Sequence, residues 1–207
     1  MMPGTKTVGI IDYQAGNLQS LQNAIRHLGA NVMRITNEQQ FQHCSHIVLP
    51  GVGAFGFCAN QLEASGLIPS LKQWAFDAQK PLLGICVGMQ LLSDHSAESL
   101  GISGLGWIGG AVHKIPPSST IRVPHVGWNS VVFEEDYNSF PCGEKQDFYF
   151  DHSFAYGSPQ YGMTIGSSTH GVKFSAVVKC DNIVAVQFHP EKSQDSGLRF
   201  LKDFLET

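Results

Sequence analysis

The chain has 207 residues, with 13 basic and 17 acidic side chains and a formal net charge of -4. At ~150 residues per domain, this length predicts one domain that spans residues 1–207. The charge balance argues against binding to nucleic acid or to anionic membranes, because both attract clustered lysine and arginine. Only 14% of the residues are charged, against ~25% in an average domain, so either the core is large or a partner covers part of the surface.

Three absences in the sequence narrow the class of protein further. The longest mostly apolar run, residues 81–92, is shorter than the ~20 residues that cross a bilayer. The first 13 residues show no pattern of a signal peptide. The five cysteines are scattered and form neither a disulfide framework nor paired zinc ligands. We therefore expect a soluble, cytoplasmic protein that needs no metal and no cofactor.

The first half of the chain alternates short apolar runs with helical patterns. The apolar runs predict strands over 7–11, 32–35, 46–49 and 82–85. Apolar residues at helical spacing predict helices over 18–28, 68–78 and 87–92, the first ending at Gly29. Strands that alternate with helices favour right-handed crossovers and a parallel sheet with helices on both faces.

The second half is punctuated by glycine, proline and serine and is rich in short β patterns. Strands are predicted over 111–115, 129–133, 147–150, 174–179 and 183–188. Few helical periods occur before a final helix over 195–205, so these strands are expected to pair antiparallel. The predicted fold class is α/β: a mostly parallel central sheet flanked by helices, with an additional mixed or antiparallel sheet.

The strongest chemical pattern is Gly84-Ile-Cys86-Val-Gly88, which lies between a predicted buried strand and a predicted helix. This is the cysteine counterpart of the Gly-x-Ser-x-Gly turn that exposes a nucleophile, where glycines avoid a collision. The turn would also place the sulfur at a helix N-terminus, which stabilises a thiolate and offers an amide to an oxyanion. The alternative is an inert core cysteine, the common fate of free cysteines. The glycine frame favours the nucleophile.

A cysteine nucleophile needs a base, and His189 is the candidate, because it lies in Phe188-His-Pro-Glu191 after the last predicted strand. In an extended segment His189 and Glu191 would point the same way, so Glu191 could fix the imidazole tautomer. Pro190 is expected to keep the segment extended. The alternative is a surface turn, which the Gly84-x-Cys86-x-Gly88 pattern elsewhere in the chain makes the weaker interpretation.

A glycine-rich loop, residues 49–56, follows the third predicted strand. Ligands of parallel sheets bind at this edge, and glycines let main-chain amides approach a developing oxyanion. A phosphate-binding loop is disfavoured because no Gly-Lys-Ser/Thr follows. The run His43-Cys-Ser-His46 could suggest a metal site, but there is no second ligand cluster, so we expect it to be incidental.

Several longer runs carry a resemblance to a known family. They are residues 10–20, 50–56, 84–92, 125–129, 149–154 and 188–193. With these runs the chain resembles the class I (triad-type) glutamine amidotransferases and, among them, the glutaminase subunits of imidazole glycerol phosphate synthase. Three positions depart from the family pattern: Gln14 replaces a usual glycine, Asp151 an apolar residue, and Phe154 a usual tyrosine.

The resemblance implies a flavodoxin-like fold and a Cys86-His189-Glu191 triad that hydrolyses glutamine through a glutamyl thioester. It also implies a heterodimer with a (β/α)₈-barrel synthase subunit, which uses the ammonia to form imidazole glycerol phosphate and an aminoimidazole carboxamide ribotide. The resemblance also implies roles for further positions. Val87 and the Val52-Gly53 turn would form the oxyanion hole, and Gln90, His152 and Ser153 would bind glutamine. The partner interface would include Trp128, Asn129, Tyr149 and Lys192.

Three alternatives remain open from the sequence. A stand-alone cysteine hydrolase would turn over without a partner. A scaffold without activity would only dock on the barrel subunit, although the intact triad argues against it. A paralogue could feed ammonia to a different barrel synthase, and this differs from the first interpretation only in the partner.

Overall fold

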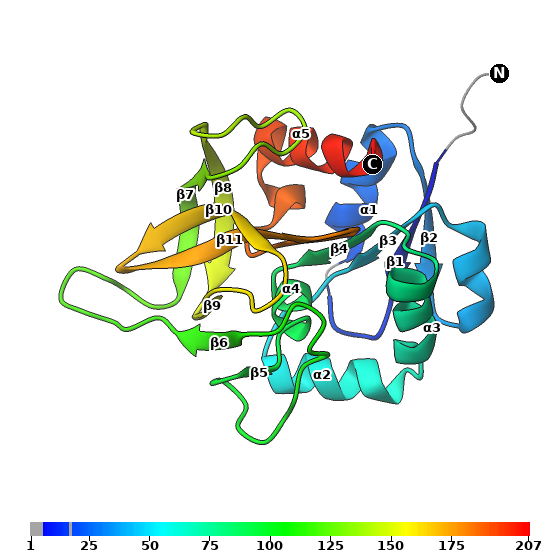
Figure 1. Cartoon of the computed structure of the whole chain (residues 1–207), viewed down its shortest axis with the longest axis horizontal. Coiled ribbons are helices and arrows are strands. Elements are labelled where there is room, and N and C mark those ends of the chain that lie inside the picture. Colours follow the sequence, from blue (N-terminus) through cyan, green and yellow to red (C-terminus); the bar gives the residue numbers. More distant parts are fainter. Residues whose placement is uncertain (1–5, 17) are drawn as a thin grey trace.

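The fold was obtained as a computed structural model that describes residues 6–16 and 18–207. Asn17, inside the 10–20 run, and residues 1–5 of the N-terminal segment discussed above lie outside the described residues. Within these bounds a nine-stranded sheet forms the centre of the molecule (Figure 1). Its strands, in order across the sheet, are β2 (Asn31–Ile35), β1 (Thr7–Ile11), β3 (His46–Leu49), β4 (Leu82–Ile85), β12 (Ile183–Val186), β11 (Val172–Cys180), β10 (Met163–His170), β7 (His125–Phe133) and β8 (Lys145–His152).

The sheet changes character at β12. From β2 to β12 neighbouring strands pair parallel, and from β12 to β8 they pair antiparallel. The predicted parallel sheet is therefore confirmed for the first half. The β-rich second half mostly extends that same sheet, and a separate small sheet holds β5 (His95–Ser96), β6 (Ala111–Lys114) and β9 (Phe154–Tyr156).

Helices cover both faces of the sheet. Figure 1 shows α1 (Leu18–His27) and α5 (Gln194–Leu205) on one side, and α2 (Phe55–Ala64) and α3 (Ile68–Lys72) on the other. Helix α3 continues into the π-helical segment η2 (Gln73–Asp77), so the predicted 68–78 helix is present with a change of winding. Short 3₁₀ turns, η1 (Glu38–His43) and η3 (Pro190–Lys192), and the short helix α4 (Val87–Leu91) complete the elements.

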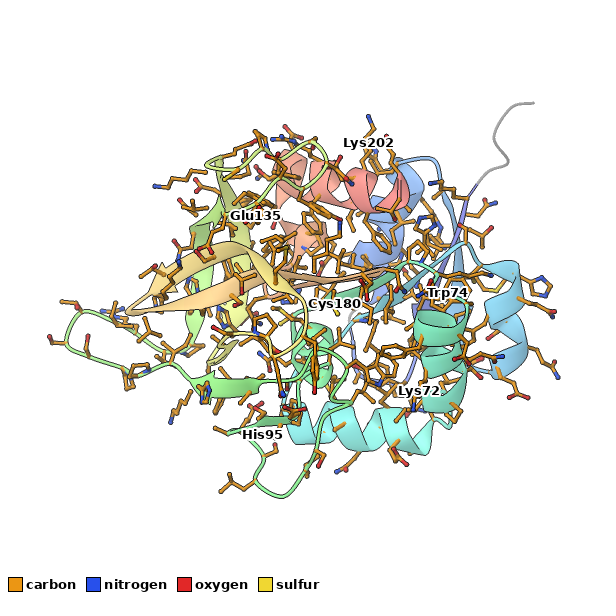
Figure 2. The ribbon with its side chains drawn as sticks, viewed as in Figure 1. Lys72, Trp74, His95, Glu135, Cys180 and Lys202 are labelled. Carbon is orange, nitrogen blue, oxygen red and sulfur yellow. The ribbon has the colours of Figure 1, made fainter. Side chains whose placement is uncertain are left out.

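Apolar side chains fill the layers between the sheet and the helices (Figure 2). Trp74 of η2 is buried and donates its indole N–H to the Pro81 carbonyl (3.0 Å), whereas Lys72 and Lys202 lie on the outer surface. Under α5, Phe148 stacks on Phe188 with ring centroids 3.9 Å apart. These contacts fix the strands whose ends carry the site. Among helices of the described part of the chain, none has the length and apolar character needed to cross a membrane.

Among the elements missed in the sequence, α2 and β10 are the longest. Helix α2 begins inside the run interpreted as a glycine-rich loop, and its first amide, Phe55 N–H, donates to the Glu98 carboxylate 43 positions later (2.8 Å). Strand β10 is rich in glycine, serine and threonine, and pairing with β11 and β7 stabilises it. Helix α2 therefore begins on a group distant in the sequence, whereas β10 forms a hairpin with β11 and also pairs with the more distant β7.

Candidate active site

Cys86 lies in the sharp turn between β4 and α4. Its backbone has φ 55° and ψ -112°, a conformation that residues other than glycine rarely adopt. The flanking glycines are required by close packing: a Cβ at Gly88 would lie 2.9 Å from the Leu49 carbonyl carbon, and one at Gly84 3.0 Å from Leu92 Cδ1. Strain of this kind persists where the surroundings enforce it, which is typical of functional sites.

His189 reaches the same edge of the sheet because β12 lies directly beside β4. Ile85 pairs with Val186, and the Cys86 N–H donates to the Val186 carbonyl (2.8 Å). The His189 Nδ1 atom lies 2.8 Å from Glu191 Oε1, and both side chains are at least nine-tenths buried. When the Nδ1–H donates to the Glu191 carboxylate, Nε2 is left free to face the thiol.

The expected extended geometry of the His189–Glu191 segment is wrong. Residues Pro190–Lys192 form η3, closed by a hydrogen bond from the Lys192 N–H to the His189 carbonyl (3.1 Å). Pro190 starts this turn, where its fixed φ and missing N–H are compatible with a helical first position. The turn, rather than an extended i, i+2 spacing, brings the carboxylate back to the imidazole.

The neighbours of His189 favour its charged form. Burial lowers the pKa of the imidazole, but the Cys86 thiolate and the Glu191 carboxylate outweigh this effect and raise the pKa to about 10. Opposite charges at contact distance stabilise the imidazolium. The arrangement therefore suits a thiolate–imidazolium pair, with a proton held where a leaving group could receive it.

The amide expected to hold the oxyanion is occupied in this structure. The Val87 N–H, at the start of α4, donates to the Gly51 carbonyl (3.3 Å). Val52 and Gly53 line the same pocket, and Gly53 has φ +96°. Val52, Gly53 and Val87 thus lie around one pocket with Cys86, and the loop conformation presents the Gly51 carbonyl to the Val87 N–H.

A pocket of about 440 Å³ opens over Cys86, which is large enough for a small amino-acid substrate. Its walls include the three residues expected to bind glutamine, Gln90, His152 and Ser153. The Gln90 amide is already engaged, donating to the Phe154 carbonyl (3.0 Å) and to Gln187 Oε1 (3.1 Å). Gln90 therefore shapes the pocket wall through its side chain.

The imidazole of His152 is held in a chain of hydrogen bonds. Its Nδ1 donates to the Phe154 carbonyl (2.8 Å), and its Nε2 lies 2.9 Å from His125 Nδ1. The Asn129 amide reaches His125 Nε2 (3.2 Å) from the other side. Burial lowers the pKa of His152 to about 4 and that of His125 to about 3, so both rings are neutral near pH 7. Both His152 nitrogens are used within the protein.

Sequence reasoning missed Gln187, which is fully buried next to the nucleophile. Its Nε2 amide donates to the Cys86 sulfur (3.8 Å). A hydrogen bond of this kind stabilises a thiolate. The available signal was a polar residue at the end of an apolar strand, two positions before the candidate base.

Three of the four expected partner residues, Trp128, Tyr149 and Lys192, contact one another on one surface. Trp128 on β7 is half exposed and meets Tyr149 on β8 edge-on, with centroids 6.3 Å apart. Lys192 Nζ lies 5.5 Å from the centre of the Tyr149 ring. The Tyr149 backbone carbonyl accepts a hydrogen bond from the His189 backbone N–H (2.9 Å), so this surface is hydrogen-bonded to the segment that carries the candidate base. The Asn129 amide instead points inward, to His125 and the Thr169 carbonyl.

The His43–His46 run forms no metal site: across residues 6–16 and 18–207, no group of three or more histidine, cysteine or acidic side chains could hold an ion. His46 is buried against Phe204 (centroids 5.2 Å apart), and burial lowers its pKa to about 4. It is a neutral core residue.

Comparison with known proteins adds independent findings. The family model for glutamine amidotransferase class-I matches residues 9–207. The chain is 43% identical to imidazole glycerol phosphate synthase subunit HisH of Methanothermobacter thermautotrophicus, over 96% of this chain and 98% of that protein. It is 41% identical to the subunit of the same name from Zymomonas mobilis, over 98% and 96%.

Solved structures show the same fold at low sequence identity. A crystal structure of a glutamine amidotransferase aligns with a TM-score of 0.75 and 16% identity, over 96% of this chain and 97% of that one. The structure of PurLQS from Thermotoga maritima aligns with a TM-score of 0.74 and 18% identity, over 98% of each chain. These alignments support the expected fold class.

Proposed function

Since the chain belongs to the class I glutamine amidotransferase family, we propose that it is the glutaminase subunit of an imidazole glycerol phosphate synthase. The observation that carries this proposal is the strained Cys86 elbow beside a buried His189–Glu191 pair, in a chain about 40% identical to HisH subunits along nearly its full length. Residues 1–207 act here as a single amidotransferase domain.

Hydrolysis proceeds in two covalent steps. The Cys86 thiolate attacks the side-chain amide carbon of glutamine, and the tetrahedral intermediate collapses as His189 Nε2 gives its proton to the departing ammonia. The resulting glutamyl thioester is attacked by water, which loses a proton to His189. Cleavage of the carbon–sulfur bond releases glutamate and restores the thiolate–imidazolium pair. Glu191 holds the imidazole orientation throughout.

The oxyanion of each tetrahedral intermediate needs two donors. The Val87 N–H supplies one, and an amide of the Val52-Gly53 turn supplies the other. Because the Gly51 carbonyl holds the Val87 N–H in this structure, the loop must rearrange before the reaction. This resting arrangement suits a subunit that hydrolyses glutamine only when a partner and an acceptor substrate are bound.

The partner in this proposal is a (β/α)₈-barrel synthase subunit, which docks on the surface formed by Trp128, Tyr149 and Lys192. Asn129 supports that surface from behind through its inward amide. The ammonia passes to the barrel and is incorporated during formation of imidazole glycerol phosphate and an aminoimidazole carboxamide ribotide. Gln90, His152 and Ser153 form the glutamine pocket. We place the complex in the cytoplasm, with no metal or cofactor.

The test is Cys86→Ala in the assembled heterodimer. Glutamine-driven product formation should be abolished while ammonium-driven formation stays at the wild-type rate, because ammonia bypasses the thiol. Cys44→Ala, which truncates another buried cysteine, is the control and should keep both activities. Glutamine-driven turnover near wild type in Cys86→Ala would show that the nucleophile is assigned wrongly.

Two alternatives give different results in the same system. A stand-alone cysteine hydrolase would release glutamate at full rate without the barrel subunit. A paralogue would be stimulated by, and would supply ammonia to, a different barrel synthase. Measuring which ribotide is aminated by the protein that co-purifies with the chain distinguishes the paralogue from the proposed subunit.

A further inference from the structure

Three consecutive carbonyls after strand β3 are each held by a different element. The Tyr13 hydroxyl, just beyond β1, donates to the Pro50 carbonyl (2.6 Å). The Val87 N–H at the start of α4 donates to the Gly51 carbonyl (3.3 Å), and the Cys58 thiol on α2 donates to the Val52 carbonyl (3.4 Å). The Tyr13 and Cys58 side chains are almost completely buried. The loop is therefore tied on both sides of the Gly51–Val52 peptide.

The Gly51–Val52 peptide is the unit that decides the state of the oxyanion hole. Its carbonyl occupies the Val87 N–H, and its own N–H belongs to Val52, the residue that lines the pocket. Rotation of this one peptide would withdraw the carbonyl and present the amide. Only glycine fits at position 51 in this conformation, since a Cβ there would lie 2.7 Å from the Gly88 nitrogen and 2.9 Å from Val87 Cβ.

We propose that Tyr13 and Cys58 are positioning residues of the oxyanion hole, because they fix the peptides on either side and confine the rearrangement to the Gly51–Val52 peptide. This inference rests on the proposed function. Without these anchors the loop would move as a whole, and the Val52 N–H would reach the site in the wrong place. Donors must lie 2.7–3.1 Å from the oxyanion to stabilise it, so small displacements matter.

The environment keeps both anchors protonated. Burial raises the pKa of the Tyr13 hydroxyl well above its ordinary value, and the nearby thiols Cys58 and Cys86 raise it further. Burial also raises the pKa of the Cys58 thiol to about 11. Each group therefore remains a hydrogen-bond donor across the pH range in which the His189 imidazolium is present.

The first test is Tyr13→Phe, which removes one hydroxyl and keeps the ring. In the heterodimer with acceptor substrate bound, we expect kcat for glutamine hydrolysis to fall by at least ~10-fold, part of the ~10²–10³ lost with a whole oxyanion donor. KM for glutamine should change less than ~2-fold, because binding precedes the need for the donor. Ammonium-driven synthesis should be unchanged. A merely structural defect would not separate kcat from KM in this way.

The matched control is Tyr137→Phe, since the buried Tyr137 hydroxyl has no hydrogen-bond partner among the described residues. It should retain wild-type kcat and KM. At the second anchor, Cys58→Ala should lower kcat in the same way, and Cys58→Ser should restore it by returning a donor.

The outcomes distinguish this inference from the proposed function. If Tyr13→Phe and Cys58→Ala both keep wild-type kcat while Cys86→Ala is inactive with glutamine, Tyr13 and Cys58 have no positioning role. The assignment of Cys86 as the nucleophile is then unaffected. If Cys86→Ala also keeps glutamine-driven turnover, the proposed function itself fails. A parallel rise in KM and fall in kcat, with loss of ammonium-driven synthesis, would also overturn the positioning role.

Discussion

Substitution of Gly88 by alanine tests how tightly the start of α4, just after Cys86, packs against the loop that follows β3 (residues 50–53, the oxyanion loop). The new Cβ would lie 2.9 Å from the Leu49 carbonyl carbon, 3.2 Å from the Pro50 carbonyl carbon, and closer still to the Leu49 oxygen. Carbon atoms pack best at ~3.5–4.0 Å, so α4 and the loop must separate by ~1 Å. The obstacles are backbone atoms on both sides, which places the cost at the upper end of the ~1–3 kcal/mol of overpacking.

The same displacement affects catalysis, because α4 carries the Val87 N–H and the loop carries its counterpart. A misplacement of ~1 Å in an active site costs ~10²-fold in rate. We therefore expect Gly88→Ala to lose ~3 kcal/mol in urea unfolding and at least ~10²-fold in kcat for glutamine in the heterodimer.

A graded series of glycine variants supplies the controls. At Gly84 the nearest atoms to a Cβ are at 3.0–3.1 Å, and at Gly157 they are at 3.4–3.7 Å, which is ordinary contact. Gly84→Ala should lose ~1–2 kcal/mol, and Gly157→Ala less than ~1 kcal/mol with unchanged kcat. The packing argument is refuted if Gly88→Ala unfolds within 1 kcal/mol of wild type and keeps its kcat.

Three further predictions concern the roles of His189 and Glu191, the pH dependence of stability, and activation by the partner subunit. His189→Ala should abolish nearly all glutamine hydrolysis. Glu191→Gln should lose less activity, although the equivalent change in a serine triad costs ~10⁴-fold. Labelling of Cys86 by a glutamine-like electrophile should be slower in His189→Ala, and equally fast labelling would contradict the role of His189 as base. The His189 pKa is raised from 6.5 to about 10, so the contribution of His189 to the free energy of unfolding is complete below pH 6.5 and is lost as pH rises through about 10. The free energy of unfolding, measured at pH 6, 8 and 10, should therefore fall more steeply for wild type than for His189→Ala. The rate of glutamate release should rise by orders of magnitude from the isolated chain to the heterodimer, and again when the acceptor is bound. Gly53→Pro should abolish this rise, since proline cannot adopt φ +96°. Full activity of the isolated chain would refute the dependence of hydrolysis on the partner.

The strands of the first half could be predicted because their signal is local. The observed bounds of β1, β3 and β4 coincide with the predicted runs, since each is a short, mostly apolar segment. Helix α2 gave no such signal, because its first turn depends on the distant Glu98 and Ser99 side chains and apolar residues occur on more than one face. Gly56, for example, packs against Ser99 and Ile102.

Most residues that line the candidate pocket could also be named from the sequence, although Gln187 was missed, whereas their geometry could not be predicted. The Gly84-x-Cys86-x-Gly88 frame indicated the elbow because its cause, steric collision, acts within five residues. The state of the oxyanion loop depends instead on which carbonyl the Val87 N–H meets. That choice is made by contacts from β1, α2 and α4, which no local pattern encodes. The η3 turn at His189 is a similar case, set by its packing under α5.

The position of β12 in the sheet has a consequence for how the protein is made. This strand enters between β4 and β11 although it follows both in the chain, and Cys86 and Gln187 are 101 positions apart. At ~5–20 residues per second, a ribosome needs ~5–20 s to deliver β12 after β4 has emerged. During that time the apolar edge of β4 is uncovered, as in any unpaired strand prone to association. Cys86 also has no candidate base until β12 and the following His189 have emerged, so the proposed Cys86–His189 pair cannot form earlier in synthesis.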